Sequence, residues 1–135
     1  MTQPQNDEKR FSLVRRAQSF SHAGRGLSLF FKTTHNAWIH LLLIACTFVG
    51  GVYFGITTNE WLALILAMGM VLGAEAFNTA IEIDINLTSP EYHPFARDTK
   101  DVAAAGVLLT AIAAFIIACT IFVPQLMALT GIYLY

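Results

Sequence analysis

Three long apolar stretches separate the polar segments of the chain. They cover residues 37–56, 61–85 and 102–123, and each approaches the roughly 20 residues that a helix needs to cross the hydrocarbon core of a bilayer. The last turns of the second stretch are unusually polar, and Pro124 follows the third. Because proline breaks the interior of a helix, the pattern predicts three transmembrane helices, the third of which ends at Pro124.

A polar arm of 36 residues precedes the first apolar stretch. Within residues 11–32, Phe11 and Val14 fall on one side of a helix, while Arg15 and Arg16 fall elsewhere. This loose alternation suits an amphipathic helix that lies in the cytoplasmic interface with its apolar side toward the lipid. An arm that serves merely as a basic topology anchor accounts for the pattern equally well.

Composition and charge agree with an integral membrane protein. Hydrophobic residues make up 56% of the chain and charged residues 13%, about half the share usual in soluble proteins. All eight Lys and Arg lie in the arm or between residues 86 and 101, and the link 57–60 has none. The positive-inside rule therefore places the N-terminus and the second loop in the cytoplasm. We expect a single all-α domain, residues 1–135, in the inner membrane, and a net charge of −1 gives no reason to expect a nucleic-acid partner.

Polar residues at intervals of three, four and four form one stripe on the second predicted helix: Glu75, Asn78, Glu82 and Asn86. Thr79 lies beside the stripe, and Asp84 falls on the opposite face. A charge at membrane depth costs several kcal/mol, so such residues face a protein interior or a wet cavity and are functional candidates. The structural alternative is an interhelical hydrogen-bond clamp, which explains an Asn and a Thr better than two Glu seven residues apart.

Further polar groups follow the stripe on the predicted cytoplasmic side: Glu91, Tyr92, His93, Arg97, Lys100 and Asp101. Pro94 suits the first turn of the third helix. Carboxylates bind Mg²⁺, Lys and Arg hold phosphates, and a deeper carboxylate could take a proton from a lipid hydroxyl. Together these groups match phosphoryl transfer from ATP to a membrane lipid. Because three spans scarcely enclose a site, we expect an oligomer.

Several motifs of the chain resemble those of a known family. They read EAFNTAIE at 75–82, SPEYHPFAR at 89–97 and KDVAA at 100–104, with SFSHAGRGL at 19–27 and NAWIHL at 36–41. These residues resemble the small prokaryotic diacylglycerol kinases, which include the undecaprenol kinases of Gram-positive bacteria. The resemblance covers about residues 15–120, and the form SPEYHP is more similar to the undecaprenol-kinase branch.

The resemblance implies a homotrimeric kinase that uses Mg-ATP at sites shared between subunits. It implies that Glu75 is the catalytic base for the lipid hydroxyl, that Asn78 supports the site, and that Glu82 holds Mg²⁺. The residues that it assigns to the nucleotide are Arg15, His22, Glu91, Tyr92, His93, Lys100 and Asp101.

The chain departs from the family pattern at three positions. Thr34 occupies the place of the usual second metal-binding Glu, Asn86 that of an Asp, and His22 that of a Tyr. A hydroxyl is a poorer Mg²⁺ ligand than a carboxylate. We expect ATP and water to complete the coordination; weaker Mg²⁺ binding and an inefficient kinase are the alternatives.

Three functions compete for the polar residues. The first is a lipid kinase that acts on undecaprenol, with diacylglycerol as the second acceptor. Another is a degenerate family member that serves as a lipid-binding or scaffold subunit, which Thr34 motivates. A third is a proton pathway built on Glu75 and Glu82, and it is disfavoured because a relay has no need of Lys100 and His93 beside it.

Overall fold

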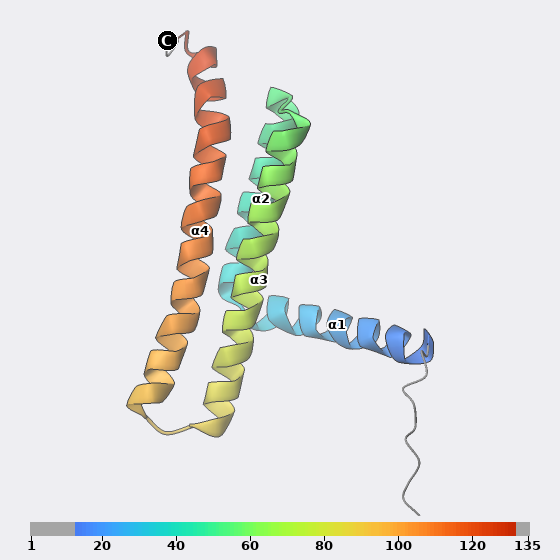
Figure 1. Cartoon of the computed structure of the whole chain (residues 1–135), viewed down its shortest axis with the longest axis vertical. Helices are drawn as coiled ribbons and strands as arrows, with labels where there is room; N and C mark the ends of the chain where they lie inside the picture. The colour runs from blue at the N-terminus through green and yellow to red at the C-terminus, as the bar shows by residue number, and fades with distance from the viewer. Residues whose placement is uncertain (1–12, 132–135) are drawn as a thin grey trace, which may run out of the picture. The chain divides into compact units, whose positions relative to one another are not determined.

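The computed structural model describes residues 13–131, with side chains from residue 16 onward. Four helices form: α1 (Leu13–Thr33), α2 (His35–Phe54), α3 (Thr58–Thr88) and α4 (Pro94–Leu129), as labelled in Figure 1. No strand occurs in this described range. Helices α2, α3 and α4 are each long and apolar enough to cross a membrane. The predicted all-α fold with three membrane-spanning helices is confirmed.

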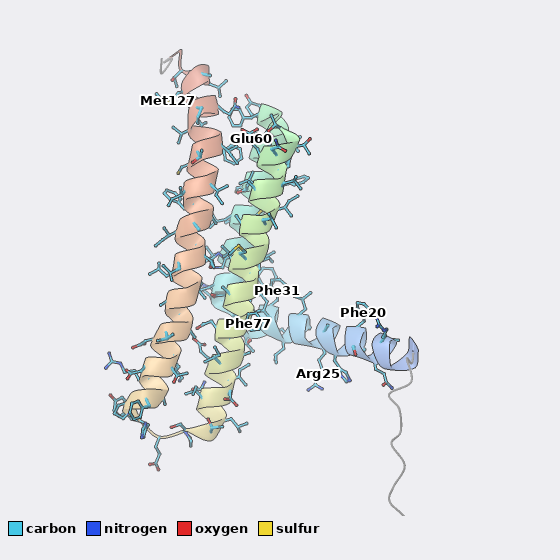
Figure 2. All side chains as sticks on the ribbon, viewed as in Figure 1. Phe20, Arg25, Phe31, Glu60, Phe77 and Met127 are labelled. Carbon is cyan, nitrogen blue, oxygen red and sulfur yellow. The ribbon has the colours of Figure 1, made fainter. Side chains whose placement is uncertain are left out.

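The chain divides into two compact units between Thr33 and Thr34. The first contains α1, whose side chains Phe20 and Leu27 are exposed. Figure 2 shows the Phe20 and Arg25 side chains on opposite sides of this helix. A helix therefore forms in the arm, and its exposed apolar side chains suit a membrane interface.

The second unit begins with a helical hairpin of α2 and α3. Gly55 ends α2 in the left-handed conformation, with φ of 63°, which glycine adopts without steric cost. Thr57 and Glu60 then start α3 with a capping box: Glu60 Oε2 accepts from the Thr57 backbone N–H at 2.7 Å, and Thr57 Oγ1 accepts from the Glu60 N–H at 3.4 Å. Local chemistry thus sets both helix ends, and the short link lies beside Glu60 (Figure 2).

The apolar core of the second unit lies near this hairpin link. Ile56, Leu64 and Ile121 are buried there, and Trp61 and Phe122 pack around them. This end of the unit is held by hydrophobic contacts. The polar residues discussed below lie toward the other end of α3 and α4.

Helices α3 and α4 are longer than the hydrocarbon core of a bilayer is thick. At 1.5 Å per residue, α3 is about 46 Å long and α4 about 54 Å, whereas the hydrocarbon core is about 30 Å thick. The two helices pack along each other and are joined through residues 89–93 (Figure 1). The last turns of α3 and the first turns of α4 therefore form a polar extension of the bundle.

The sequence predicted that the third helix ends at Pro124, and this prediction is wrong. Helix α4 continues through Pro124 to Leu129. In an apolar environment, leaving the helix would expose several backbone groups without water to bind them, whereas Pro124 removes a single backbone donor. Continuing the helix is therefore the less costly solution.

Candidate active site

Burial changes steadily along the polar stripe of α3. Glu75 is 2% exposed and Asn78 is 9% exposed, while Glu82 and Asn86 are exposed. Since α3 is one unbroken helix, the predicted sharing of a face holds for all four residues. The stripe therefore has a buried end at Glu75 and an open end at Asn86.

Asn78, in the middle of the stripe, has one bonded and one unbonded polar atom within residues 13–131. Its Nδ2 donates to Glu82 Oε1 at 3.1 Å. Its Oδ1 is buried and, among the described residues, has no hydrogen-bond partner. A buried acceptor without a partner costs about 1–3 kcal/mol. Asn78 is therefore prepared to accept a hydrogen bond from an incoming O–H or N–H group.

Thr79 makes two contacts at the level of Glu75. Its hydroxyl lies 2.9 Å from the Glu75 carbonyl oxygen and 2.8 Å from the Thr34 hydroxyl. Thr34, at the start of α2, is the residue that the sequence placed at the usual second metal position. The structure thus brings Thr34 to α3 and pairs its hydroxyl with Thr79.

Glu82 is the residue of α3 that the sequence assigned to Mg²⁺, and this role stays a prediction. Within the described part of the chain, no three His, Cys, Asp or Glu side chains come together as a metal site. Mg²⁺ commonly takes one or two carboxylates and fills its other positions with water and substrate phosphates. The exposed Glu82 carboxylate, oriented by Asn78, fits that kind of site.

A polar pocket of about 290 Å³ lies where α3 meets α4. Its lining includes all five nucleotide candidates that the sequence placed in this region: Glu91, Tyr92, His93, Lys100 and Asp101. His93 also begins α4, where its Nδ1 accepts from the Phe95 N–H at 3.3 Å. Arg97 and Asp101 form an exposed ion pair at 3.5 Å. The structure therefore gathers these candidates around one opening.

Asn86 has a contact that the sequence did not predict. Lys100 Nζ donates to Asn86 Oδ1 at 2.6 Å, which ties α4 to the open end of the stripe. The short connection between α3 and α4 was the available signal, because it brings the last turns of one helix level with the first turns of the other. Asn86 thus positions the Lys100 ammonium without neutralising it.

Two candidates lie on α1, in the other unit. His22 is exposed there, and the side chain of Arg15 lies outside the described residues. Their roles at the nucleotide stay predictions.

The stripe and the pocket lie within the part of the chain that matches a known protein family. The sequence profile of the prokaryotic diacylglycerol kinases matches residues 21–122, a range that includes the stripe and the pocket. The chain belongs to this family. The family resemblance seen in the motifs is therefore confirmed.

Similar proteins are named either undecaprenol kinase or diacylglycerol kinase. Undecaprenol kinase of Bacillus subtilis (strain 168) is 34% identical over 119 residues, which cover 88% of this chain and 97% of the relative. Diacylglycerol kinase of Synechocystis sp. (strain ATCC 27184 / PCC 6803 / Kazusa) is 34% identical over 112 residues, covering 82% of this chain and 64% of the relative. Diacylglycerol kinase of Helicobacter pylori (strain ATCC 700392 / 26695) is 38% identical over 50 residues, 37% of this chain and 39% of the relative.

The unpartnered oxygen of Asn78 allows a test of whether the polar stripe is functional or is a structural hydrogen-bond clamp. Replacing Asn78 with Leu removes this buried orphan, and the lost partner Glu82 is exposed to solvent. We expect the free energy of unfolding of Asn78→Leu to stay within about 1 kcal/mol of wild type or to rise. Reversible unfolding in mixed micelles measures it. A loss of about 2 kcal/mol or more would favour the clamp.

Proposed function

We propose that undecaprenol is the acceptor of this lipid kinase, with diacylglycerol as the second candidate. Membership of the prokaryotic diacylglycerol kinase family makes the chain a lipid kinase with ATP as co-substrate. Two observations support undecaprenol: the form SPEYHP at 89–94, and alignment with 97% of the length of an undecaprenol kinase. Both acceptors present a hydroxyl on a long apolar body, so the same site chemistry serves either.

The buried end of the stripe is the feature that best supports a lipid kinase function. An acceptor hydroxyl that reaches it would donate a hydrogen bond to Asn78 Oδ1, which otherwise has no partner among the described residues. The hydroxyl has one hydrogen, so it would exchange the bond to Asn78 for one to the Glu75 carboxylate, one turn deeper on the same face and 2% exposed. Glu75 would then take this proton as general base. The hydroxyl oxygen then bonds to the γ-phosphorus of ATP, the bond from that phosphorus to the β-phosphate oxygen breaks, and ADP leaves.

The open end of the stripe and the adjoining pocket suit the nucleotide. Glu82 would hold Mg²⁺ together with ATP phosphates and water; bound there, the ion would neutralise charge on the phosphates. Lys100, positioned by Asn86, would bind phosphate oxygens. The remaining pocket side chains, Glu91, Tyr92, His93 and Asp101, would contact the rest of the nucleotide.

The same proposal sets orientation and assembly. ATP is cytoplasmic, so the pocket and the N-terminus face the cytoplasm and the protein resides in the inner membrane, as the placement of Lys and Arg supports. The three-helix unit leaves large apolar side chains such as Phe77 and Phe115 exposed. Lipid and neighbouring subunits would cover them in the homotrimer that the family resemblance implies.

A lipid-binding scaffold without efficient catalysis is the second candidate. The pairing of Thr34 with Thr79 favours it, because the position expected to supply a second metal ligand bonds to another hydroxyl. A scaffold would bind lipid and ATP without transferring phosphate. A proton pathway through Glu75 and Glu82 is disfavoured by the nucleotide-suited pocket.

Phosphate transfer by the purified protein distinguishes these functions. With labelled ATP, Mg²⁺ and each lipid supplied separately, we expect label on undecaprenol in excess of diacylglycerol. Glu75→Gln should lower transfer by about 10² or more, since it removes the general base. Glu60→Gln is the matched control, because a Gln also completes a capping box, and it should transfer at the wild-type rate.

Three results would contradict the proposal. Wild-type transfer rates in Glu75→Gln would remove Glu75 from the chemistry. Greater label on diacylglycerol would reverse the order of acceptors. Binding of ATP without transfer to either lipid would identify the scaffold.

Lys100 should lose phosphate affinity when its partner is removed. In Asn86→Leu, the hydrogen bond that holds the Lys100 ammonium disappears, so the KM for ATP should rise about threefold to tenfold while kcat changes little. Asn59→Leu makes the same substitution in the exposed first turn of α3 and should leave both constants unchanged. Equal KM values in the two variants would show that Asn86 has no part in nucleotide binding.

A further inference from the structure

Thr34 precedes the first turn of α2, but its hydroxyl makes no hydrogen bond to that turn. It is the N-cap of α2, in an extended conformation, and its side chain makes no capping hydrogen bond. Threonine at this position ordinarily accepts from a backbone N–H of the first turn. Here the hydroxyl instead lies 2.8 Å from Thr79 Oγ1 on α3, 45 residues away in sequence. A tertiary contact has replaced the local one.

The direction of this hydrogen bond follows from the number of protons. Thr79 has one hydroxyl hydrogen, and it donates this hydrogen to the Glu75 carbonyl oxygen at 2.9 Å, an atom that can only accept. Thr34 must therefore donate to Thr79. The result is an ordered series of two hydrogen bonds from the start of α2, through Thr79, to the backbone of Glu75.

We propose that Thr34 is a positioning residue for phosphoryl transfer. Its hydrogen bond holds the N-cap of α2 against the turn of α3 that carries Glu75 and Asn78, both buried. This inference rests on the proposed function and deepens it. Thr34 then acts with Thr79 on the general base instead of binding the metal, which accounts for a hydroxyl at a position where the resemblance leads one to expect a carboxylate.

Positioning matters here because catalysis by a base depends on geometry. Displacement of about 1 Å at a reacting group can cost on the order of a hundredfold in rate. Glu75 lies on α3 in the part of the bundle away from the hydrophobic core at Ile56, Leu64 and Ile121. A hydroxyl contact between helices is therefore well placed to fix this turn.

The test compares variants at the two hydroxyls. Thr34→Val keeps the shape and removes the hydrogen bond, Thr34→Ser keeps the hydroxyl, and Thr79→Val removes the acceptor. Thr120→Val is the matched control: its hydroxyl makes the same bond to a backbone carbonyl one turn earlier, Ile116 at 2.8 Å. All are assayed for kcat, for KM of the lipid and for the Mg²⁺ concentration at half-maximal rate.

We expect kcat of Thr34→Val to fall about threefold to twentyfold, the range of measured interhelical hydrogen bonds in membranes. The Mg²⁺ dependence and the KM for the lipid should stay within about twofold, and Thr34→Ser should recover most of the rate. Because Thr34 acts through Thr79, the double Val variant should be no slower than Thr79→Val alone. Thr120→Val should match wild type.

Other results overturn the proposal. A rise in the Mg²⁺ requirement of Thr34→Val, with kcat restored at saturating Mg²⁺, would make Thr34 a metal ligand. Independent, multiplying effects of the two Val substitutions would break the link to Thr79. An unchanged kcat in Thr34→Val would remove any positioning role.

A stability measurement separates this inference from the proposed function. Thermal unfolding midpoints of wild type, the two single Val variants and the double variant need no activity. If the shifts in unfolding midpoint of the two single variants are not additive in the double variant, the Thr34–Thr79 contact is supported. If the contact is supported and wild type transfers no phosphate, it is the proposed function that is wrong. Additive shifts overturn the contact itself.

Discussion

A polar side chain that has no partner inside a bilayer has a high free-energy cost, and this cost constrains the polar stripe of α3. Hydrocarbon supplies no water, so each buried polar atom needs a partner from the protein or from a ligand. Asn78 donates to Glu82 one turn away, and the Thr79 hydroxyl bonds to the Glu75 backbone carbonyl oxygen and to the hydroxyl of Thr34, the N-cap of α2. One acceptor, Asn78 Oδ1, has none among the described residues. A lipid hydroxyl would supply a hydrogen bond to this oxygen.

Helix length connects this buried point to a soluble co-substrate. Because α3 and α4 are each longer than the hydrocarbon is thick, one face of α3 runs from buried Glu75 to exposed Asn86 and on to the pocket at the start of α4. An apolar acceptor and a charged nucleotide can thus approach the same stripe from opposite ends. The hydrophobic contacts near Ile56 and Leu64 lie away from this stripe, so the stripe can consist of polar residues.

Much of this could be predicted from sequence, because it follows from period and length. Three apolar stretches indicated three spans, and spacings of three and four residues put Glu75, Asn78 and Glu82 on one face. Pro124 was misjudged because its usual effect assumes water for the freed backbone groups. The Thr34–Thr79 and Asn86–Lys100 contacts join different helices. They depend on how those helices meet, which periodicity within one helix does not report.

The position of the acceptor hydroxyl tests the central claim most directly. A long-chain lipid alcohol with a photoreactive diazirine beside its hydroxyl would be crosslinked to the protein, and the adducts mapped by mass spectrometry. We expect adducts on α3 between Glu75 and Thr79, and their loss when the hydroxyl is replaced by a methyl ether. Adducts confined to exposed positions outside this turn, such as Leu66 and Phe115, and identical for both probes, would contradict this placement of the acceptor.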